Sequence, residues 1–403
     1  MNASHDADTE YLSEGITEVL IDDLTEIENL RVIPRASAFR FKGTSDLRGA
    51  AAALHVQALI TGRVLRHGDA LSVQADLIDI REDRQLWGGR YVKRMSDLVT
   101  IQSEIARDIS DHLRLRISSD TRRRVIRPPT TIPAAFDAYL KGRYFWNKRT
   151  ADDLRKSIEY FRQAIDIDPN YALAYAGIAD AYQLLGYHGS GALPPDQAMP
   201  QAKAAADKSL ELDPNLAEAH VSKAGILMHY DWTLPAAEAE FRRGLALNPN
   251  YPTGHQWLAF SLVEQQKFDD GLAEMKKAQE LDPLSMVINA NVSWMNYFAR
   301  RYAEGEREAL RSREVDPSFY ATYWVLGMIH TQMGRHAEAI ADGEHAVALT
   351  NRNVLQRARL AHALAAGGRT SEARAELNEI LQIAHNRYVP PYVIALVYIA
   401  LGD

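Results

Sequence analysis

Residues 237–249 read AEAEFRRGLALNP, and this stretch decides the fold because its pattern returns along the second half of the chain. It ends on an Asn-Pro pair, and further Asp-Pro pairs close other stretches with similar apolar spacing. Proline cannot continue a helix and biases the residue before it away from helical geometry, so each pair ends one helix and sets the turn to the next. The prolines are Pro169, Pro214, Pro249, Pro283 and Pro317, spaced 45, 35, 34 and 34 residues apart.

Each segment between these proline pairs is predicted to contain two helices. YALAYAGIADAYQLLG (171–186) and DGLAEMKKAQEL (270–281) carry apolar residues at the i, i+3, i+4 and i+7 positions of an amphipathic helix. Each unit is therefore a helix A, a short turn, a helix B and the proline pair. A period of 34 with two helices resembles the tetratricopeptide repeat, and Ala237, Phe241 and Gly244 occupy its small and aromatic slots. The resemblance covers about residues 133–403 and implies an all-α right-handed solenoid.

Counting helices over 133–403 predicts seven pairs and one unpaired final helix. That last helix, in 388–403, is apolar, whereas a solenoid normally closes with a polar cap, so we expect the chain to be cut from a longer parent. The 45-residue spacing contains HGSGALPPDQAMP (188–200), which is rich in glycine and proline. We expect this insertion to be a surface loop within the second pair.

The first 124 residues have a different sequence pattern, in which helical and strand-like segments are mixed. EYLSEGITEVLIDDL (10–24) predicts an amphipathic helix, and the β-branched and aromatic residues of LRVIPRASAFRF (30–41) predict a strand. A second helix is expected over 45–55, then two alternating strands over 57–80 joined at His67-Gly68-Asp69, a third strand over 84–94, and a long helix from residue 95. This order predicts a small α+β domain over residues 1–121, with a mostly antiparallel sheet and helices on one face.

The same segments resemble the TolB amino-terminal-like domain, which in bacterial signalling proteins directly precedes tetratricopeptide repeats. The resemblance implies that the chain corresponds to the C-terminal half of a serine/threonine protein kinase, a winged-helix regulator or a class III nucleotide cyclase. Domains of this kind begin with a hydrophobic strand upstream of the stretch matching 2–15, and that strand is absent here. We therefore expect one exposed strand edge, and no effector module within this chain.

Residues 122–132 are expected to link the two domains. Arg122, Arg123, Arg124 and Arg127 form the one dense basic stretch, which could contact anionic lipid or nucleic acid. The prolines that follow favour instead a solvated, semi-rigid linker.

Composition excludes several classes of function. The net charge of −7 argues against a general nucleic-acid binder, and the lack of cysteine excludes disulfides, thiolate nucleophiles and cysteine-based metal sites. No phosphate loop, HExxH, nucleophile elbow, EF-hand or kinase motif occurs, and the histidines are scattered singly. We expect no enzyme activity, cofactor, metal or membrane span in this chain. Its compartment stays open: cytoplasmic by default, extracytoplasmic if a parent is anchored upstream.

Two functions are compatible with this pattern: an interaction scaffold that binds a protein or peptide in the concave groove, or the regulatory arm of a missing effector. In the second and third pairs the groove-facing slots lack the Lys, Asn and Arg of the family's carboxylate clamp, so we expect no strong binding of acidic chaperone tails. From the fourth pair onward the slots, at i, i+3 and i+7 along each helix A, hold an aromatic stripe. Some of these side chains could instead pack against neighbouring helices, because the register is uncertain by a residue or two. The predicted partner-binding residues are Gln256, Phe260, Trp294, Tyr297, Phe298, Trp324 and Met328.

Overall fold

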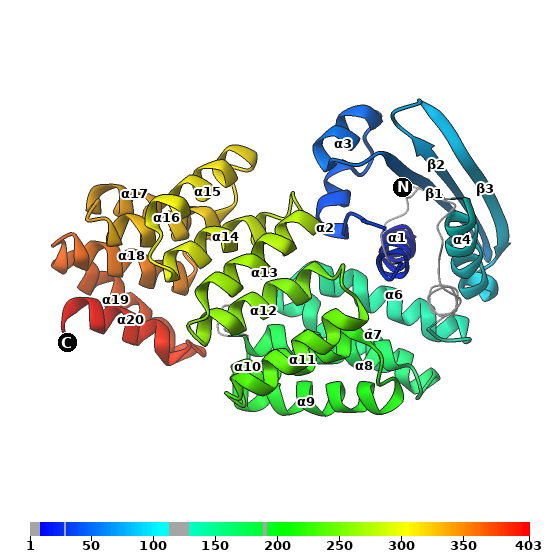
Figure 1. Ribbon diagram of the computed structural model, residues 1–403. Helices are drawn as coiled ribbons and strands as arrows, with labels where there is room; N and C mark the ends of the chain where they lie inside the picture. Colours follow the sequence, from blue (N-terminus) through cyan, green and yellow to red (C-terminus); the bar gives the residue numbers. More distant parts are fainter. Residues whose placement is uncertain (1–8, 28–29, 113–128, 188–191) are drawn as a thin grey trace. The chain divides into compact units, whose positions relative to one another are not determined.

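The computed structural model describes residues 9–27, 30–112, 129–187 and 192–403. It divides into two compact units (Figure 1). The amino-terminal unit comprises residues 1–184 and 199–254, and the carboxy-terminal unit comprises residues 185–198 and 255–403. Each is described by itself below.

The amino-terminal unit begins with a three-stranded antiparallel sheet and its helices. The strands pair in the order β1-β2-β3, and Gly68, with a φ of +60°, makes the predicted tight turn between the first two. Buried residues of β2 and of α1 and α4 share one core with the first repeat helices, so these helices cover one face of the sheet (Figure 1). The elements are α1 (Glu10–Thr25), α2 (Arg35–Ala38), η2 (Phe39–Phe41), α3 (Leu47–Leu54), β1 (Ala58–His67), β2 (Ala70–Asp79), β3 (Arg84–Arg94), η3 (Met95–Asp97) and α4 (Leu98–His112).

The strand predicted over 30–41 is wrong. Residues 30–34 carry no strand pairing, and α2 and η2 follow as one short helical stretch. Pro34 precedes the first turn of α2, and its carbonyl oxygen accepts a hydrogen bond from the backbone N–H of Ala38 at 3.0 Å. Ile33 is buried in the core instead of pairing in the sheet. The β-branched residues therefore serve packing, not strand formation.

Helices alternate from residue 133 to the end, as the 34-residue period predicts. The starts of α12, α14, α16 and α18 lie 34 residues apart, at Pro252, Met286, Tyr320 and Val354. The helices are α6 (Pro133–Asn147), α7 (Ala151–Ile167), α8 (Ala172–Gly186), α9 (Pro195–Leu212), α10 (Ala217–His229), α11 (Leu234–Leu247), α12 (Pro252–Glu264), α13 (Phe268–Leu281), α14 (Met286–Phe298), α15 (Tyr302–Val315), α16 (Tyr320–Gln332), α17 (His336–Leu349), α18 (Val354–Ala366), α19 (Thr370–Asn386) and α20 (Pro391–Leu401).

The loop predicted over 188–200 is shorter than expected. Helix α9 already begins at Pro195 and runs through Pro200. Proline is favoured at a first helical position and Asp196 suits the positive end of the helix dipole, so the proline-rich segment starts a helix rather than avoiding one. Residues 188–191 lie outside the described residues, as do the basic arginines of the predicted linker.

None of the described helices is long and apolar enough to cross a membrane.

Candidate functional site: an aromatic pocket in the carboxy-terminal unit

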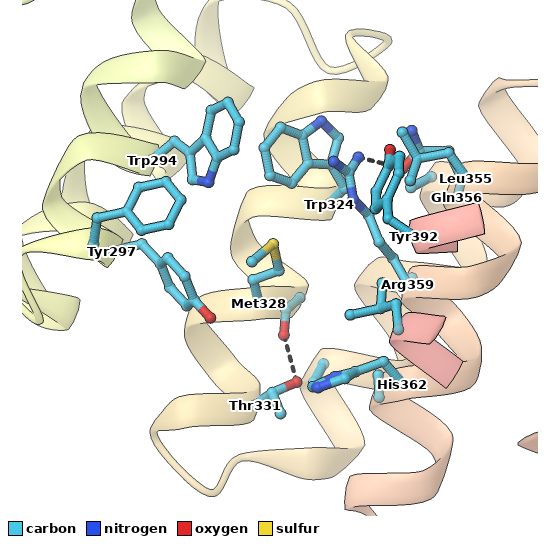
Figure 2. A pocket seen from close by; sticks show the side chains of 17 residues that line it. Trp294, Tyr297, Trp324, Met328, Thr331, Leu355, Gln356, Arg359, His362 and Tyr392 are labelled. Atoms are coloured by element: carbon cyan, nitrogen blue, oxygen red, sulfur yellow. Dashed lines mark hydrogen bonds between the residues drawn. The ribbon is translucent and has the colours of Figure 1, made fainter. Parts of the chain in front are cut away.

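A pocket of about 210 Å³ opens between helices α14, α16, α18 and α20 (Figure 2). We call it the aromatic pocket. Five of the seven residues predicted from sequence line it: Trp294, Tyr297, Phe298, Trp324 and Met328. Sequence periodicity placed them together because helices one repeat apart present equivalent positions to the same side. The additional polar lining comes chiefly from α18 and α20, with Gln356, Arg359, His362 and Tyr392.

The other two predicted residues lie beside the pocket, not in its wall. Phe260 is 9% exposed, and its ring centroid lies 5.3 Å from that of Trp294, so it supports the indole from behind. Gln256 lies half-buried on the same helix, α12. Their place in the repeat is equivalent to that of pocket residues, but the pocket is walled by the later helices.

The aromatic side chains form a continuous contact chain. The rings of Trp294 and Trp324 meet edge to face with centroids 5.1 Å apart, and Phe298 lies 5.4 Å from Trp294. Phe298 is 39% exposed at the rim of this chain. Edge-to-face aromatic pairs hold fixed relative orientations, so they give the pocket a stiff apolar wall.

Trp324 has two roles. It lines the pocket, yet it is only 7% exposed and belongs to a core cluster with Val325 and Ile329. From the sequence, some residues of the aromatic stripe could instead pack against neighbouring helices. Trp324 does both: it packs in the core and it lines the pocket. Phe298, which is exposed, is the better residue for a substitution that spares the core.

Arg359 is a pocket residue that the sequence reasoning missed. Its guanidinium carbon lies 3.8 Å from the centroid of the Trp324 ring, and its Nη1 donates to Oε1 of Gln356 at 3.2 Å (Figure 2). Across the described ranges no carboxylate forms an ion pair with it, and burial lowers its pKa. The residue one period after Trp324 is Ala358, so the strict period falls one position short of the arginine.

His362 follows Met328 by one full period and could have been found from the repeat alone. Burial lowers the pKa of its imidazole, which favours the neutral ring. The pocket thus offers apolar walls, one cation and one neutral imidazole.

The amino-terminal unit presents a contrasting contact, between α1 and α6. Glu18 of α1 is 3% exposed, and its Oε1 accepts a hydrogen bond from Nε of Arg143 at 2.8 Å. Its Oε2 accepts from Nδ2 of Asn147 at 2.7 Å. The Arg143 guanidinium carbon also lies 4.4 Å from the ring centroid of Trp146. We call this arrangement the α1–α6 contact; here an arginine stacked on a tryptophan already holds a carboxylate.

The far end of α1 is held by the turn that closes the third helix pair. Nδ2 of Asn248 donates to Oγ1 of Thr25 at 3.2 Å, and Nδ2 of Asn250 donates to the Thr25 carbonyl oxygen at 3.1 Å. These bonds join residues more than 200 positions apart, so no local pattern in the sequence signals them. The contact explains how the small α/β part and the first repeats share one core.

The slots compared above with the carboxylate clamp hold no basic side chain: they are Leu173, Ala176 and Asp180 on α8 and Glu218, Val221 and Gly225 on α10. Asp180 accepts a hydrogen bond from Oγ of Ser222. Burial raises the pKa of Glu218 to about 7. Arg143 and Asn147, which hold the carboxylate of Glu18, lie on α6, one repeat earlier than these slots.

Comparison with known proteins shows which repeat family and which proteins this chain is similar to. Models of the tetratricopeptide repeat match residues 148–171 and 330–392. The chain is 30% identical over 179 residues to the putative adenylate cyclase 3 of Rhizobium meliloti (strain 1021). That match covers 44% of this chain and 30% of the relative, so the chain spans under a third of the relative's length.

Two solved structures are similar at low identity. A tetratricopeptide repeat protein from Parabacteroides merdae is 14% identical, with a TM-score of 0.48, covering 66% of this chain and 99% of that one. Pseudomonas aeruginosa PilF is 17% identical, with a TM-score of 0.39, covering 53% and 94%. The second family match spans α17, α18 and α19 and includes Arg359 and His362. The chain therefore carries tetratricopeptide repeats, and one of the matched segments forms a wall of the aromatic pocket.

Proposed function

We propose that the chain is a non-catalytic protein–protein interaction scaffold that binds a peptide segment of a partner in the aromatic pocket. The observation that carries this proposal is the pocket itself: an open, apolar hollow walled by aromatic and methionine side chains of consecutive repeat helices. Tryptophan, tyrosine and arginine are the residues that most often dominate binding energy at protein interfaces. We propose no nucleic-acid or cofactor role for this chain.

The test is a selection of random twelve-residue peptides, displayed on phage, against the full chain. Enriched peptides are then measured by calorimetry against Phe298→Arg, which places a charge at the exposed rim of the pocket. The matched control is Tyr398→Arg, because Tyr398 is 37% exposed on α20 and does not line the pocket. We expect the rim variant to lose at least tenfold in affinity and the control to bind like wild type. Peptides that bind both variants equally well would contradict the proposal.

A second proposal follows from the cyclase relative. We propose that the chain serves as the regulatory arm of a nucleotide cyclase, since 44% of it aligns with a protein named as a putative adenylate cyclase. The kinase and winged-helix parents stay hypotheses from resemblance alone. Reading the gene upstream of the codon for Met1 tests this proposal: an in-frame cyclase domain supports it, and a stop codon or a signal peptide there contradicts it.

A further inference from the structure

We propose that the aromatic pocket binds a partner segment that sets one carboxylate against Arg359 and a large apolar side chain against Tyr297 and Phe298. This inference rests on the proposed function and names the chemistry of the partner. It concerns the carboxy-terminal unit alone.

The first support is the isolated charge of Arg359. It is the single charged side chain among the residues that line the pocket, with His362 neutral beside it. Its partners within the described chain are the ring of Trp324 and the amide oxygen of Gln356, neither of which carries a negative charge. A partly desolvated guanidinium without a counterion is costly, and cation–π stacking offsets only part of that cost. A bound carboxylate would supply the missing charge.

The second support is a precedent within the same molecule. In the α1–α6 contact, the Arg143 guanidinium lies over the Trp146 ring and also donates a hydrogen bond to the carboxylate of Glu18. In the aromatic pocket, Arg359 also lies over a tryptophan ring, that of Trp324, but no described carboxylate pairs with it. Stacking fixes the plane of a guanidinium while leaving its N–H edge free to bind an acid. The two sites therefore differ in the source of the carboxylate: Glu18 of the same chain in the first, and a bound partner in the second.

The apolar half of the partner follows from the opposite wall. Tyr297 of α14 and Met328 of α16 lie across the pocket from α18 (Figure 2), and Phe298 of α14 lines the same pocket. Methionine and aromatic side chains there would bury a leucine-sized or aromatic group. A single guanidinium matches a single negative charge, whereas a phosphate carries nearly two and would leave charge unpaired in an apolar pocket.

The experiment uses the selected peptides. For an enriched peptide that binds in the pocket, each Asp or Glu is replaced by Asn or Gln, and affinities are measured for wild type and Arg359→Gln. We expect one acidic position whose amide variant binds wild type at least tenfold more weakly. The same amide change should have little effect on binding to Arg359→Gln, because the pair is already broken. Arg369→Gln is the control, since Arg369 pairs with Glu372 on the surface of α19 outside the pocket.

Thermal melts show first that Arg359→Gln is folded. Peptides that lose affinity in Phe298→Arg but bind Arg359→Gln as tightly as wild type would overturn this inference and leave the scaffold proposal standing. Enrichment of peptides without an acid, or binding that requires a phosphorylated residue, would also overturn it. So would sedimentation showing that the chain dimerises through this pocket, because its occupant would then be a second copy.

Discussion

The α1–α6 contact and the aromatic pocket use the same pair of side chains for different ends. Both stack an arginine on a tryptophan, at 4.4 Å for Arg143 and 3.8 Å for Arg359. In the amino-terminal unit Glu18 of the same chain pairs with the arginine, and this carboxylate is buried. In the carboxy-terminal unit the corresponding space is open. The difference teaches that the repeat surface supplies a recognition element, and that its surroundings decide whether it serves folding or binding.

The largest expected effect comes from breaking the wall of the open pocket. Trp324→Ala removes a nearly buried indole from the core and should lower the free energy of unfolding by about 3–5 kcal/mol. Urea unfolding followed by circular dichroism measures this change. Trp324→Phe keeps an aromatic ring and should be clearly milder. A loss below about 1 kcal/mol for the alanine variant would show that Trp324 acts in the pocket alone.

Removing the carboxylate from the α1–α6 contact should lower the free energy of unfolding slightly less. Glu18→Ala leaves Arg143 buried without its acid, and removal of one partner of a buried ion pair costs about 3 kcal/mol or more. Hydrogen exchange should show faster exchange in both α1 and α6. Glu211→Ala, which removes an exposed ion pair with Lys208, should change stability by less than about 1 kcal/mol.

The pair in this contact can be replaced to sharpen the comparison. A Glu18→Met, Arg143→Met double variant should recover part of the stability lost in Glu18→Ala, since apolar residues can substitute for a buried ion pair. A double variant as unstable as the single one would indicate that the other two partners of Glu18, the amide of Asn147 and the guanidinium of Arg35, hold α1 in place.

Period and packing explain what could be read from sequence. The apolar spacing and the proline pairs predicted the helices, and the 34-residue period brought Trp294, Tyr297 and Met328 to one wall. Arg359 was not among the predicted pocket residues because it lies one residue off that period. The strand expected over 30–41 failed because its β-branched residues pack into the core. The α1–α6 contact has no periodic signal at all, since Glu18 lies outside the repeats and 125 residues from Arg143.

The smallest expected effect is a pH dependence in the carboxy-terminal unit. His330 on α16 hydrogen-bonds through Nδ1 to Asp342 at 2.7 Å and through Nε2 to Glu306 at 3.1 Å. Burial lowers its pKa, but these two bonds raise it by more, so its net pKa lies above 6.5. The protonated ring therefore adds stability below about pH 6.5, and this stability is lost as the pH rises through the folded-state pKa.

Melting temperatures between pH 6 and 9 check this dependence. His330→Gln should remove the fall in Tm that this group causes, whereas His385→Gln, at an exposed position in α19, should leave it in place. An unchanged pH profile in the His330 variant would contradict the assigned role.

The most direct test of the whole comparison is methionine-methyl NMR of the full chain titrated with a selected peptide. Met328 lines the aromatic pocket, while Met228 is buried on α10 in the amino-terminal unit. If the open pocket is the binding site, the Met328 methyl signal shifts on titration and that of Met228, which does not line the pocket, stays in place. A shift of Met228 with no change at Met328 would contradict the account.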